Sequence, residues 1–253
     1  MRSQQTSFIN HQKQQVTMNQ PVCVIVGVGS GNGASFARKF AIEGYRVAML
    51  SRNITYLNKL AQEIPNSKAY QYDVTQIESA AQIFQLIESE MGAISILVYN
   101  AGAGAFSNID DASVESFQQA WEVNARGLFI VTKQVIPQMR KLKGGSIVII
   151  GATASIKGGA NFTPFASAKA AQRSLAQSMA RFLDPEKIHV SYLIVDGVID
   201  LERTRKAMPD KPDDYFINPN PDDLAESVWF LTQQPPSAWT FELDLRPFGE
   251  KWE

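Results

Sequence analysis

A glycine-rich segment between residues 21 and 44 constrains the fold of this chain more than any other feature. It begins with a short apolar run from Val22 to Val26 and ends with small and aromatic residues at helical spacing. Between these parts lie four glycines at alternate positions: Gly27, Gly29, Gly31 and Gly33. This order predicts a buried strand, a tight turn and a helix.

A turn of this kind can bind an anion. Glycines allow backbone N–H groups to approach a pyrophosphate closely, and the N-terminus of the following helix adds partial positive charge at the same place. We therefore expect this segment to bind a dinucleotide, although an ordinary strand-to-helix turn would also use glycines.

The other apolar runs alternate with amphipathic segments along the chain. The expected strands are Val22–Val26, Arg46–Leu50, Ala69–Tyr72, Ile94–Tyr99, Ser146–Ile150, His189–Val195 and Phe241–Leu245. Strands that alternate with helices form a doubly wound parallel sheet. The sequence therefore predicts an α/β fold with a seven-stranded parallel sheet flanked by helices.

The size of the chain fits a single domain. It has 253 residues, of which 45% are hydrophobic, so it can bury the core of one α/β domain. We place this domain at residues 21–253. Residues 1–20 are polar and rich in glutamine, without the apolar stretch of a signal peptide, and we predict a flexible extension there.

Charge and cysteine content argue against several kinds of partner. The formal net charge is -1, with acidic and basic residues interspersed, which does not favour binding to nucleic acid or to an anionic membrane. The apolar runs are too short to cross a bilayer. One cysteine, Cys23, and two histidines do not make the pattern of a metal site. We expect a cytoplasmic protein that acts on a small molecule.

The end of the second strand predicts the type of dinucleotide. An acidic residue there would accept hydrogen bonds from the 2′-hydroxyl of an adenosine ribose, whereas an arginine would accommodate a 2′-phosphate. The sequence has Arg52 and no acid at this point, followed by Asn53 as a plausible helix N-cap. We therefore predict NADP(H) over NAD(H), although an exposed arginine that opens a helix is the simpler alternative.

Two further segments are expected to line a substrate pocket, namely residues 104–120 and residues 200–219. The second of them is polar and contains prolines, so it forms either a lid or a plain surface loop. Helices are expected to begin near Asn124 and near Thr163. The sequence Asn220-Pro221-Asp222-Asp223 is a strong helix start.

Taken together, these landmarks resemble the short-chain dehydrogenase/reductase family along the chain from Pro21 onward. The matching motifs are Gly27-x-x-x-Gly31-x-Gly33, Asp73, Asn100-Ala101-Gly102 and Val123-Asn124-x-x-Gly127. In that family these are the cofactor loop, the acid that contacts adenine, the NAG motif and the segment with the catalytic Asn. The resemblance implies a Rossmann fold, a nicotinamide cofactor and oxidoreductase activity.

The resemblance also assigns roles to individual residues. The set that would bind the cofactor is Gly27, Gly29, Ser30, Gly31, Asn32, Gly33, Arg52, Asp73, Val74, Asn100, Ala101, Gly102, Lys169 and Val198. Asn124 and Lys169 match catalytic positions of the family. Lys169 alone could still hold the nicotinamide ribose, so its presence favours cofactor binding rather than turnover.

The departures from the family concern its proton-carrying groups. The family uses a Ser after the fifth strand to orient the substrate carbonyl, and a Tyr-x-x-x-Lys in which Tyr is the general acid/base. Here Ala152 stands in the Ser place and Phe165 in the Tyr place, and Phe162 occupies the Tyr position of the related enoyl reductases. Neither Phe nor Ala has an ionisable proton, so the usual carbonyl reduction should be severely slowed. Asp196-Gly197 also replaces the family's Pro-Gly.

Four nearby hydroxyl groups could in principle replace the missing acid. Thr153 and Ser155 lie in the same loop as Ala152, and Thr163 and Tyr99 lie near the other motifs. Loop hydroxyls usually cap or turn the backbone, and a tyrosine at a strand end usually packs in the core. We therefore do not expect any of them to take over.

The leading hypothesis is an NADP(H)-binding short-chain oxidoreductase with an atypical active site. Its substrate would be a C=C or carbonyl compound that needs no tyrosine, such as an alkene conjugated to a thioester or ketone. The alternative is a catalytically inactive sensor or scaffold of the same fold, which the double loss at Phe165 and Ala152 favours. By the same resemblance, the helices Asn124–Lys141 and Thr163–Leu183 would pack across a two-fold axis in a homodimer or homotetramer.

Overall fold

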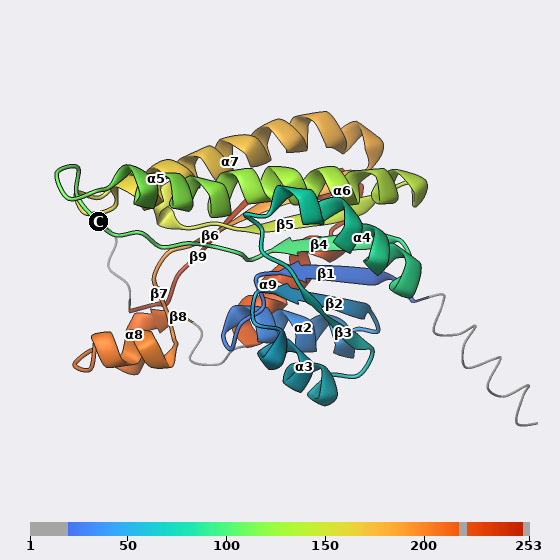
Figure 1. The fold of residues 1–253 in the computed structure, drawn as a ribbon, viewed down its shortest axis with the longest axis horizontal. Coiled ribbons are helices and arrows are strands. Elements are labelled where there is room, and N and C mark those ends of the chain that lie inside the picture. The colour runs from blue at the N-terminus through green and yellow to red at the C-terminus, as the bar shows by residue number, and fades with distance from the viewer. Residues whose placement is uncertain (1–19, 218–221, 250–253) are drawn as a thin grey trace, which may run out of the picture.

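The computed structural model describes residues 20–217 and 222–249 (Figure 1). Of the predicted extension at residues 1–20, only Gln20 is among them. The residues Asn220 and Pro221, predicted to start a helix, also lie outside the described residues, and the helix begins at Asp222 in the structure.

A seven-stranded parallel sheet runs through the centre of the molecule, as the sequence predicts. Its strand order is β3-β2-β1-β4-β5-β6-β9. The strands are β1 Val22–Val26, β2 Arg46–Ser51, β3 Ser67–Gln71, β4 Ile94–Tyr99, β5 Gly145–Ile150, β6 Ile188–Val195 and β9 Glu242–Leu245. Strand order reverses at β1, which pairs with β2 on one side and β4 on the other. In open parallel sheets, ligands bind beyond the carboxyl ends of the strands at such a switch point.

Helices cover both faces of the sheet (Figure 1). One face carries α4 Ile77–Met91, α5 Val114–Trp121, α6 Gly127–Lys141 and α7 Thr163–Leu183. The other carries α2 Asn32–Ile42, α3 Ile54–Glu63 and α9 Asp222–Gln233. The crossovers through α2 and α3 lie on one face and those through α4, α6 and α7 on the other, which gives the doubly wound arrangement.

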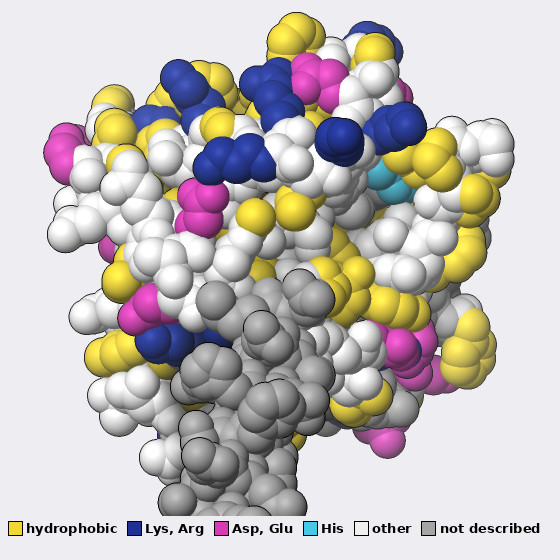
Figure 2. Space-filling view, turned by 90° about the vertical axis from the view of Figure 1, so that its right-hand side faces the viewer, with side chains coloured by type: hydrophobic (Ala, Val, Ile, Leu, Met, Phe, Trp, Pro, Cys, Tyr) yellow, Lys and Arg dark blue, Asp and Glu magenta, His cyan; other side chains and the backbone are white. Residues whose placement is uncertain are grey.

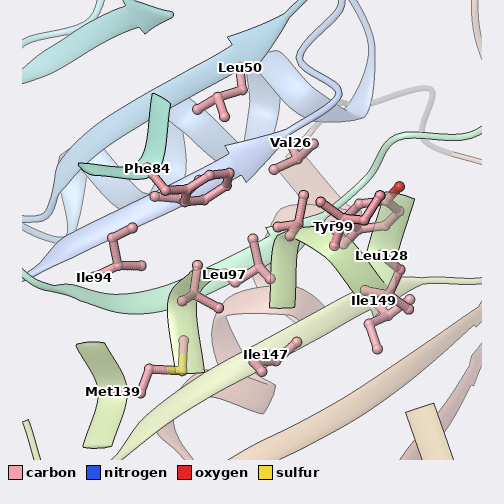
Figure 3. Close-up of a cluster of buried hydrophobic side chains, with 14 of the residues drawn as sticks. Val26, Leu50, Phe84, Ile94, Leu97, Tyr99, Leu128, Met139, Ile147 and Ile149 are labelled. Atoms are coloured by element: carbon pink, nitrogen blue, oxygen red, sulfur yellow. The ribbon is translucent and has the colours of Figure 1, made fainter. Parts of the chain in front are cut away.

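Each face of the sheet buries its own apolar core. Figure 3 shows part of the core beneath α4 and α6, where Phe84 and Met139 lie over residues of the central strands such as Leu97 and Ile147. Phe36, Phe40 and Leu57 anchor the core on the opposite face. The central strands β1, β5 and β6 are buried on both sides, and for this reason they appear in the sequence as largely apolar runs, whereas β3 and β9 at the two edges carry exposed polar residues.

Helix α5 and the turn after it were not predicted. Residues 104–120 were expected to line a pocket, yet Val114–Trp121 are helical, and a single π turn at Glu122–Arg126 joins α5 to α6. In α5 only Ala120 is buried, so the apolar periodicity that identifies a helix in a sequence does not reflect a core-facing stripe here.

The segment 200–219 is also more regular than a plain loop. It contains α8 Glu202–Ala207 and the short strand β8 Phe216–Ile217, which pairs in parallel with β7 Val198–Ile199. Both residues of β8 are buried. A two-residue strand is too short to show a periodic pattern, and the sequence gives no other signal for it.

The edge of the sheet at the amino ends of the strands faces the viewer in Figure 2. On this face, Lys and Arg side chains lie along the upper part of the view, with Asp and Glu side chains among and below them. A cavity of about 560 Å³ opens at this edge, with Met91, Ser146 and Trp239 in its wall. It therefore lies away from the switch point at the carboxyl ends. None of the described helices is both long and apolar enough to span a membrane.

Candidate active site

Hydrogen bonds join the turns after β1 and β4 at the switch point. The Asn100 side chain donates a hydrogen bond from Nδ2 to the Gly27 carbonyl oxygen at 2.8 Å, and its backbone N–H donates to the Val26 carbonyl at 2.9 Å. Gly27 has a φ of 91°, and a Cβ there would lie 2.5 Å from the backbone nitrogen of Ala101. Only glycine fits, because both the backbone conformation and the neighbouring chain exclude a side chain.

Of the other three glycines in the turn, only Gly29 has open space beside it. A Cβ on Gly33 would lie 2.7 Å from Val28 Cα, and one on Gly31 would lie 2.6 Å from Leu201 Cδ2, whereas a Cβ on Gly29 would meet nothing within 4 Å. No described side chain caps α2, and its first turn has no acidic residue. The Ala34 N–H of this turn already donates to the Gly31 carbonyl at 3.0 Å, and the partial positive charge of a helix N-terminus favours an anion at this end of α2.

Arg52 and Asp73 lie at the carboxyl ends of β2 and β3, near the glycine turn. Arg52 is exposed, and its guanidinium makes no hydrogen bond or ion pair with any described residue. Asp73 accepts hydrogen bonds at Oδ1 from the Thr75 backbone N–H at 3.0 Å and from Thr75 Oγ1 at 2.8 Å. The carboxylate of Asp73 is therefore fixed in place, whereas Arg52 is free to contact a ligand. Val74 is buried.

Lys169 is the buried charged group of the site. Its Nζ donates to the Ile150 carbonyl at 2.9 Å and to Gln172 Oε1 at 3.0 Å, and the side chain is only 4% exposed. Burial lowers the pKa of Lys169 to about 7, because the low-polarity surroundings penalise the charged form. This amine can therefore exist in both protonation states near neutral pH.

Phe165 lies one helical turn before Lys169, as the spacing predicts. The Lys169 Nζ is 6.0 Å from the centre of the Phe165 ring. Ala152 begins the short turn that connects β5 to α7, and its carbonyl accepts a hydrogen bond from Ser155 Oγ at 2.7 Å. The structure thus brings Phe165 and Lys169 together on one face of α7.

Asn124 sits in the π turn between α5 and α6 and is buried. Its Nδ2 donates to the carbonyl oxygens of Ala120 at 2.8 Å and Ala103 at 3.0 Å. Its Oδ1 is buried without a hydrogen-bond partner among the described residues. A π turn inside a helix often marks a functional site, and the unpartnered oxygen lies toward the loop after β4, facing Gly102.

Gln172 connects Lys169 and Asn124 and was not predicted from the sequence. Its Nε2 donates to the Asn124 carbonyl at 2.9 Å, and its Oε1 accepts from both Lys169 Nζ and, at 3.2 Å, the Tyr192 hydroxyl. The available signal was an amide three residues after Lys169, which places it on the same face of α7. Asn124 and Lys169 are therefore joined through Gln172 rather than by direct contact.

Three of the four alternative hydroxyl groups, those of Tyr99, Thr153 and Ser155, have hydrogen-bond partners in the structure. Tyr99 is fully buried, and its hydroxyl donates to the Val123 carbonyl at 2.5 Å. Thr153 Oγ1 donates to Asp196 Oδ1 at 2.5 Å, and Ser155 bonds back to its own turn. Burial raises the pKa of Tyr99 well above its usual range, which opposes a role as a proton donor and acceptor near neutral pH. Val198 begins β7 and is half-buried.

Comparison with known proteins places this architecture in a family. The family model described as short chain dehydrogenase matches residues 21–212, which is well over half of the sequence. The chain belongs to the short-chain dehydrogenase family. The match covers the glycine turn, the Asn100 loop, Asn124 and Lys169.

Individual relatives in this family are distant in sequence. The chain is 27% identical over 244 residues to SSP0419, an oxidoreductase of Staphylococcus saprophyticus, covering 92% of this chain and 99% of the relative. It is 28% identical over 239 residues to YuxG, an oxidoreductase of Bacillus subtilis, covering 84% of this chain but spanning only 35% of that protein. It is also similar in structure to an alcohol dehydrogenase from the archaeon Thermococcus sibiricus complexed with 5-hydroxy-NADP. That structure has a TM-score of 0.83 and 26% identity, over 93% of this chain and 100% of the other.

Proposed function

We propose that this short-chain dehydrogenase binds NADP(H) and reduces a C=C or carbonyl substrate at an active site without the usual tyrosine. The observation that carries the proposal is a contrast within one site. The glycine turn has the shape of a dinucleotide cradle, and Lys169 is present, while Phe165 and Ala152 occupy the positions of the family's Tyr and Ser.

The described residues fit the cofactor. The open space at Gly29 and the uncapped start of α2 would receive the pyrophosphate, and the free guanidinium of Arg52 would face a 2′-phosphate. Asp73 and Val74 would contact the adenine, and Asn100 to Gly102 would approach the ribose and nicotinamide. The solved relative from Thermococcus sibiricus, which holds an NADP derivative, supports a nicotinamide cofactor for this chain.

The proton donors present in the site determine which substrates can be reduced. When bound, NADPH would supply a hydride. Reduction of an isolated carbonyl also needs a proton at the oxygen, and neither Phe165 nor Ala152 can donate one. An alkene conjugated to a ketone or thioester can accept the hydride at its β-carbon and then take a proton from water at its α-carbon. Such a substrate does not require the missing hydroxyl.

Lys169 would act mainly as a binding group. Its Nζ already donates to Ile150 and Gln172, which fixes its position at the end of β5. A lysine held there can donate to a ribose hydroxyl, and the lowered pKa makes the strength of that contact depend on pH near neutrality. Gln172 and Asn124 would keep Lys169 and the loop after β4 in a fixed relation.

A titration with NADPH and NADH tests the cofactor site. We expect the wild-type protein to bind NADPH more tightly than NADH, and Arg52→Ala to remove that preference by weakening NADPH binding about tenfold, the loss of roughly one charge-assisted contact. Arg181→Ala is the matched control, because Arg181 is an exposed arginine of α7 that bonds only to its own helix. The proposal fails if neither nucleotide binds.

A catalytically inactive sensor or scaffold is the second candidate. The loss of hydroxyl groups at both Phe165 and Ala152 favours it, since one loss alone would leave a possible hydrogen-bond donor. A panel of enones and enoyl thioesters separates the two functions. Consumption of NADPH with any member supports the enzyme, whereas tight binding of NADPH without consumption across the panel supports the sensor.

We also propose a homo-oligomer formed through α5, α6 and α7. Val114, Phe117 and Trp121 are exposed on α5 at three- and four-residue spacing, so they share one face of that helix. Phe129 on α6 and Phe182 on α7 are exposed as well. Exposed apolar patches of this kind mark interaction sites. Light scattering should give a dimer or tetramer, and Phe129→Asp should shift it toward the monomer.

A further inference from the structure

Three phenylalanines form an exposed cluster beside Lys169. We call Phe106, Phe162 and Phe165 the aromatic platform. Their ring centres lie 5.2 Å apart between Phe106 and Phe162 and 5.4 Å apart between Phe106 and Phe165, both in edge-to-face geometry. The Phe106 ring is 66% exposed and that of Phe162 is 39% exposed. Large apolar side chains that gather at a surface commonly mark a binding site.

Contacts with two glycines and one backbone hydrogen bond position the aromatic platform. The Phe106 ring packs over Gly104, where a Cβ would come within 3.0 Å of it, and the Phe162 ring packs over Gly159 in the same way at 2.9 Å. The backbone N–H of Thr163 donates to the Ser107 carbonyl at 3.0 Å, which joins the loop after β4 to the start of α7. The exposed rings are thus positioned by their own loops, so they can offer a preformed surface to a ligand.

The aromatic platform is continuous with the proposed reaction site. Phe165 is its inner member and lies 6.0 Å from Lys169 Nζ, while Phe106 and Phe162 extend outward from it. A substrate with a ring could therefore lay that ring against Phe106 and Phe162 while its reacting bond lies near Phe165. Phenylalanine offers no hydrogen bond, so a surface of this composition selects apolar, uncharged rings that pack edge-to-face or offset.

We propose that the aromatic platform binds the ring of an uncharged aryl-substituted enone, and that it makes the enzyme specific for ring-bearing substrates. This inference rests on the proposed function, of which it names the substrate class. Phe106 and Phe162 are then specificity-determining residues. Phe165 has a double consequence, because the substitution that removes the tyrosine hydroxyl also completes the apolar surface.

Two enones that differ only in the presence of a ring test the proposal. Benzylideneacetone carries a phenyl group where pent-3-en-2-one carries a methyl group, and the two share the reacting bond. Their dissociation constants are measured by ligand-observed NMR with NADP⁺ present and absent. We expect benzylideneacetone to bind at least tenfold more tightly to the wild-type protein. The double variant Phe106→Ala with Phe162→Ala should reduce that ratio to less than threefold without changing the affinity for NADP⁺.

A control variant and a folding measurement distinguish a loss of binding from a loss of structure. Phe230→Ala removes an exposed phenylalanine of α9, on the opposite face of the sheet, and should leave the ratio unchanged. Circular dichroism reports whether the double variant folds, and Phe106→Ala alone replaces it if it does not. Equal binding of the two enones by wild type, or a ring preference that survives the variants, overturns the proposal.

NADPH consumption with the same two enones separates this inference from the proposed function. A ring preference in binding without consumption leaves the aromatic platform standing and contradicts the reductase. Consumption of both enones at equal kcat/KM supports the reductase and overturns the aromatic platform.

Discussion

The glycine turn after β1 and the loop between β5 and α7 both belong to the proposed active site, yet they are constrained by different physics. At Gly27 and Gly33 the nearest atoms to an added Cβ are backbone atoms of neighbouring segments, which cannot move aside. At Phe165 and Ala152, by contrast, the packing requires only an aromatic ring and a small side chain. Steric constraint preserves the cradle, whereas a hydroxyl can be lost without disturbing the fold.

The fold and the catalytic chemistry of this chain therefore depend on different residues. A chain can keep every residue that shapes the cofactor site and still lose the groups that move protons. The family membership of this chain therefore supports cofactor binding more directly than it supports any particular turnover.

The largest expected effect comes from restoring the missing hydroxyl groups. In the double variant Phe165→Tyr with Ala152→Ser, we expect carbonyl reductase activity to rise by about 10²–10⁴-fold, the range typical of a positioned general acid. The Tyr hydroxyl would lie near Lys169, whose ammonium form would favour the phenolate. NADPH oxidation with small ketones and aldehydes is the measurement.

Each single variant serves as the control for the double one. Phe165→Tyr alone should give part of the gain, and Ala152→Ser alone should give almost none, because it orients a carbonyl without supplying the proton. A double variant that binds NADPH yet stays inactive would show that the loop between β5 and α7 has diverged beyond these two side chains.

The glycine turn should respond in the opposite manner at Gly33, because a side chain added there would clash with the backbone. Gly33→Ala places a methyl group 2.7 Å from Val28 Cα and should lower the free energy of unfolding by about 2–3 kcal/mol, as overpacking does. Gly29→Ala is the matched control, since its methyl group meets no protein atom within 4 Å. It should leave the melting temperature unchanged and weaken NADPH binding, because the space it fills is the space proposed for the pyrophosphate. Thermal melts with and without NADPH separate the two effects.

The sequence predicted the central strands well because they are buried on both faces. Val22–Val26 and Ile94–Tyr99, which are apolar apart from Ser95, have identical bounds in the prediction and in the structure. Helix α5 was not predicted although its apolar residues Val114, Phe117 and Trp121 stand at helical spacing, and in the structure all three are exposed. Periodicity indicates which residues share a face, but it does not say whether that face is covered by the same chain.

The site was predictable where its residues follow a fixed spacing and unpredictable where they meet through the fold. Phe165 and Lys169 lie four residues apart on α7 and could be placed together from the sequence. The link from Lys169 through Gln172 to Asn124 spans 48 residues between Asn124 and Gln172 and depends on the packing of α7 against the π turn. The aromatic platform likewise joins Phe106 of the loop after β4 to Phe162 and Phe165 at the start of α7.

The buried amine of Lys169 gives a pH-dependent effect of intermediate size. Burial lowers the pKa of Lys169 to about 7, whereas a lysine in an unfolded chain titrates near 10.4. Between these values the unfolded chain binds more protons, so native stability rises with pH by up to about 1.4 kcal/mol per pH unit. That contribution is complete above the unfolded pKa and is lost as the pH falls through the folded pKa.

Replacing Lys169 with methionine should remove this dependence. Between pH 7 and pH 9 the free energy of unfolding of the wild type should rise relative to Lys169→Met by roughly 2–3 kcal/mol, measured by urea denaturation. The variant should also bind NADPH more weakly. Parallel stability curves for the two proteins would mean that Lys169 is charged in the folded state, and its proposed contact with the ribose would then not vary with pH near neutrality.

The smallest expected effect is the loss of stability in Asn53→Ala. Comparison with Arg52→Ala, at the adjacent residue, separates helix stability from nucleotide binding. Asn53 caps α3, and its side-chain oxygen accepts a hydrogen bond from the Tyr56 backbone N–H at 3.0 Å. Asn53→Ala should therefore cost about 1 kcal/mol of stability, the usual effect of losing an N-cap, without changing the ratio of NADPH to NADH affinity. Arg52→Ala should do the reverse, because its guanidinium contacts no described residue. If instead Asn53→Ala shifts the nucleotide ratio as strongly as Arg52→Ala, the preference follows from the position of α3 rather than from the charge of Arg52, and the arginine no longer explains the choice of cofactor.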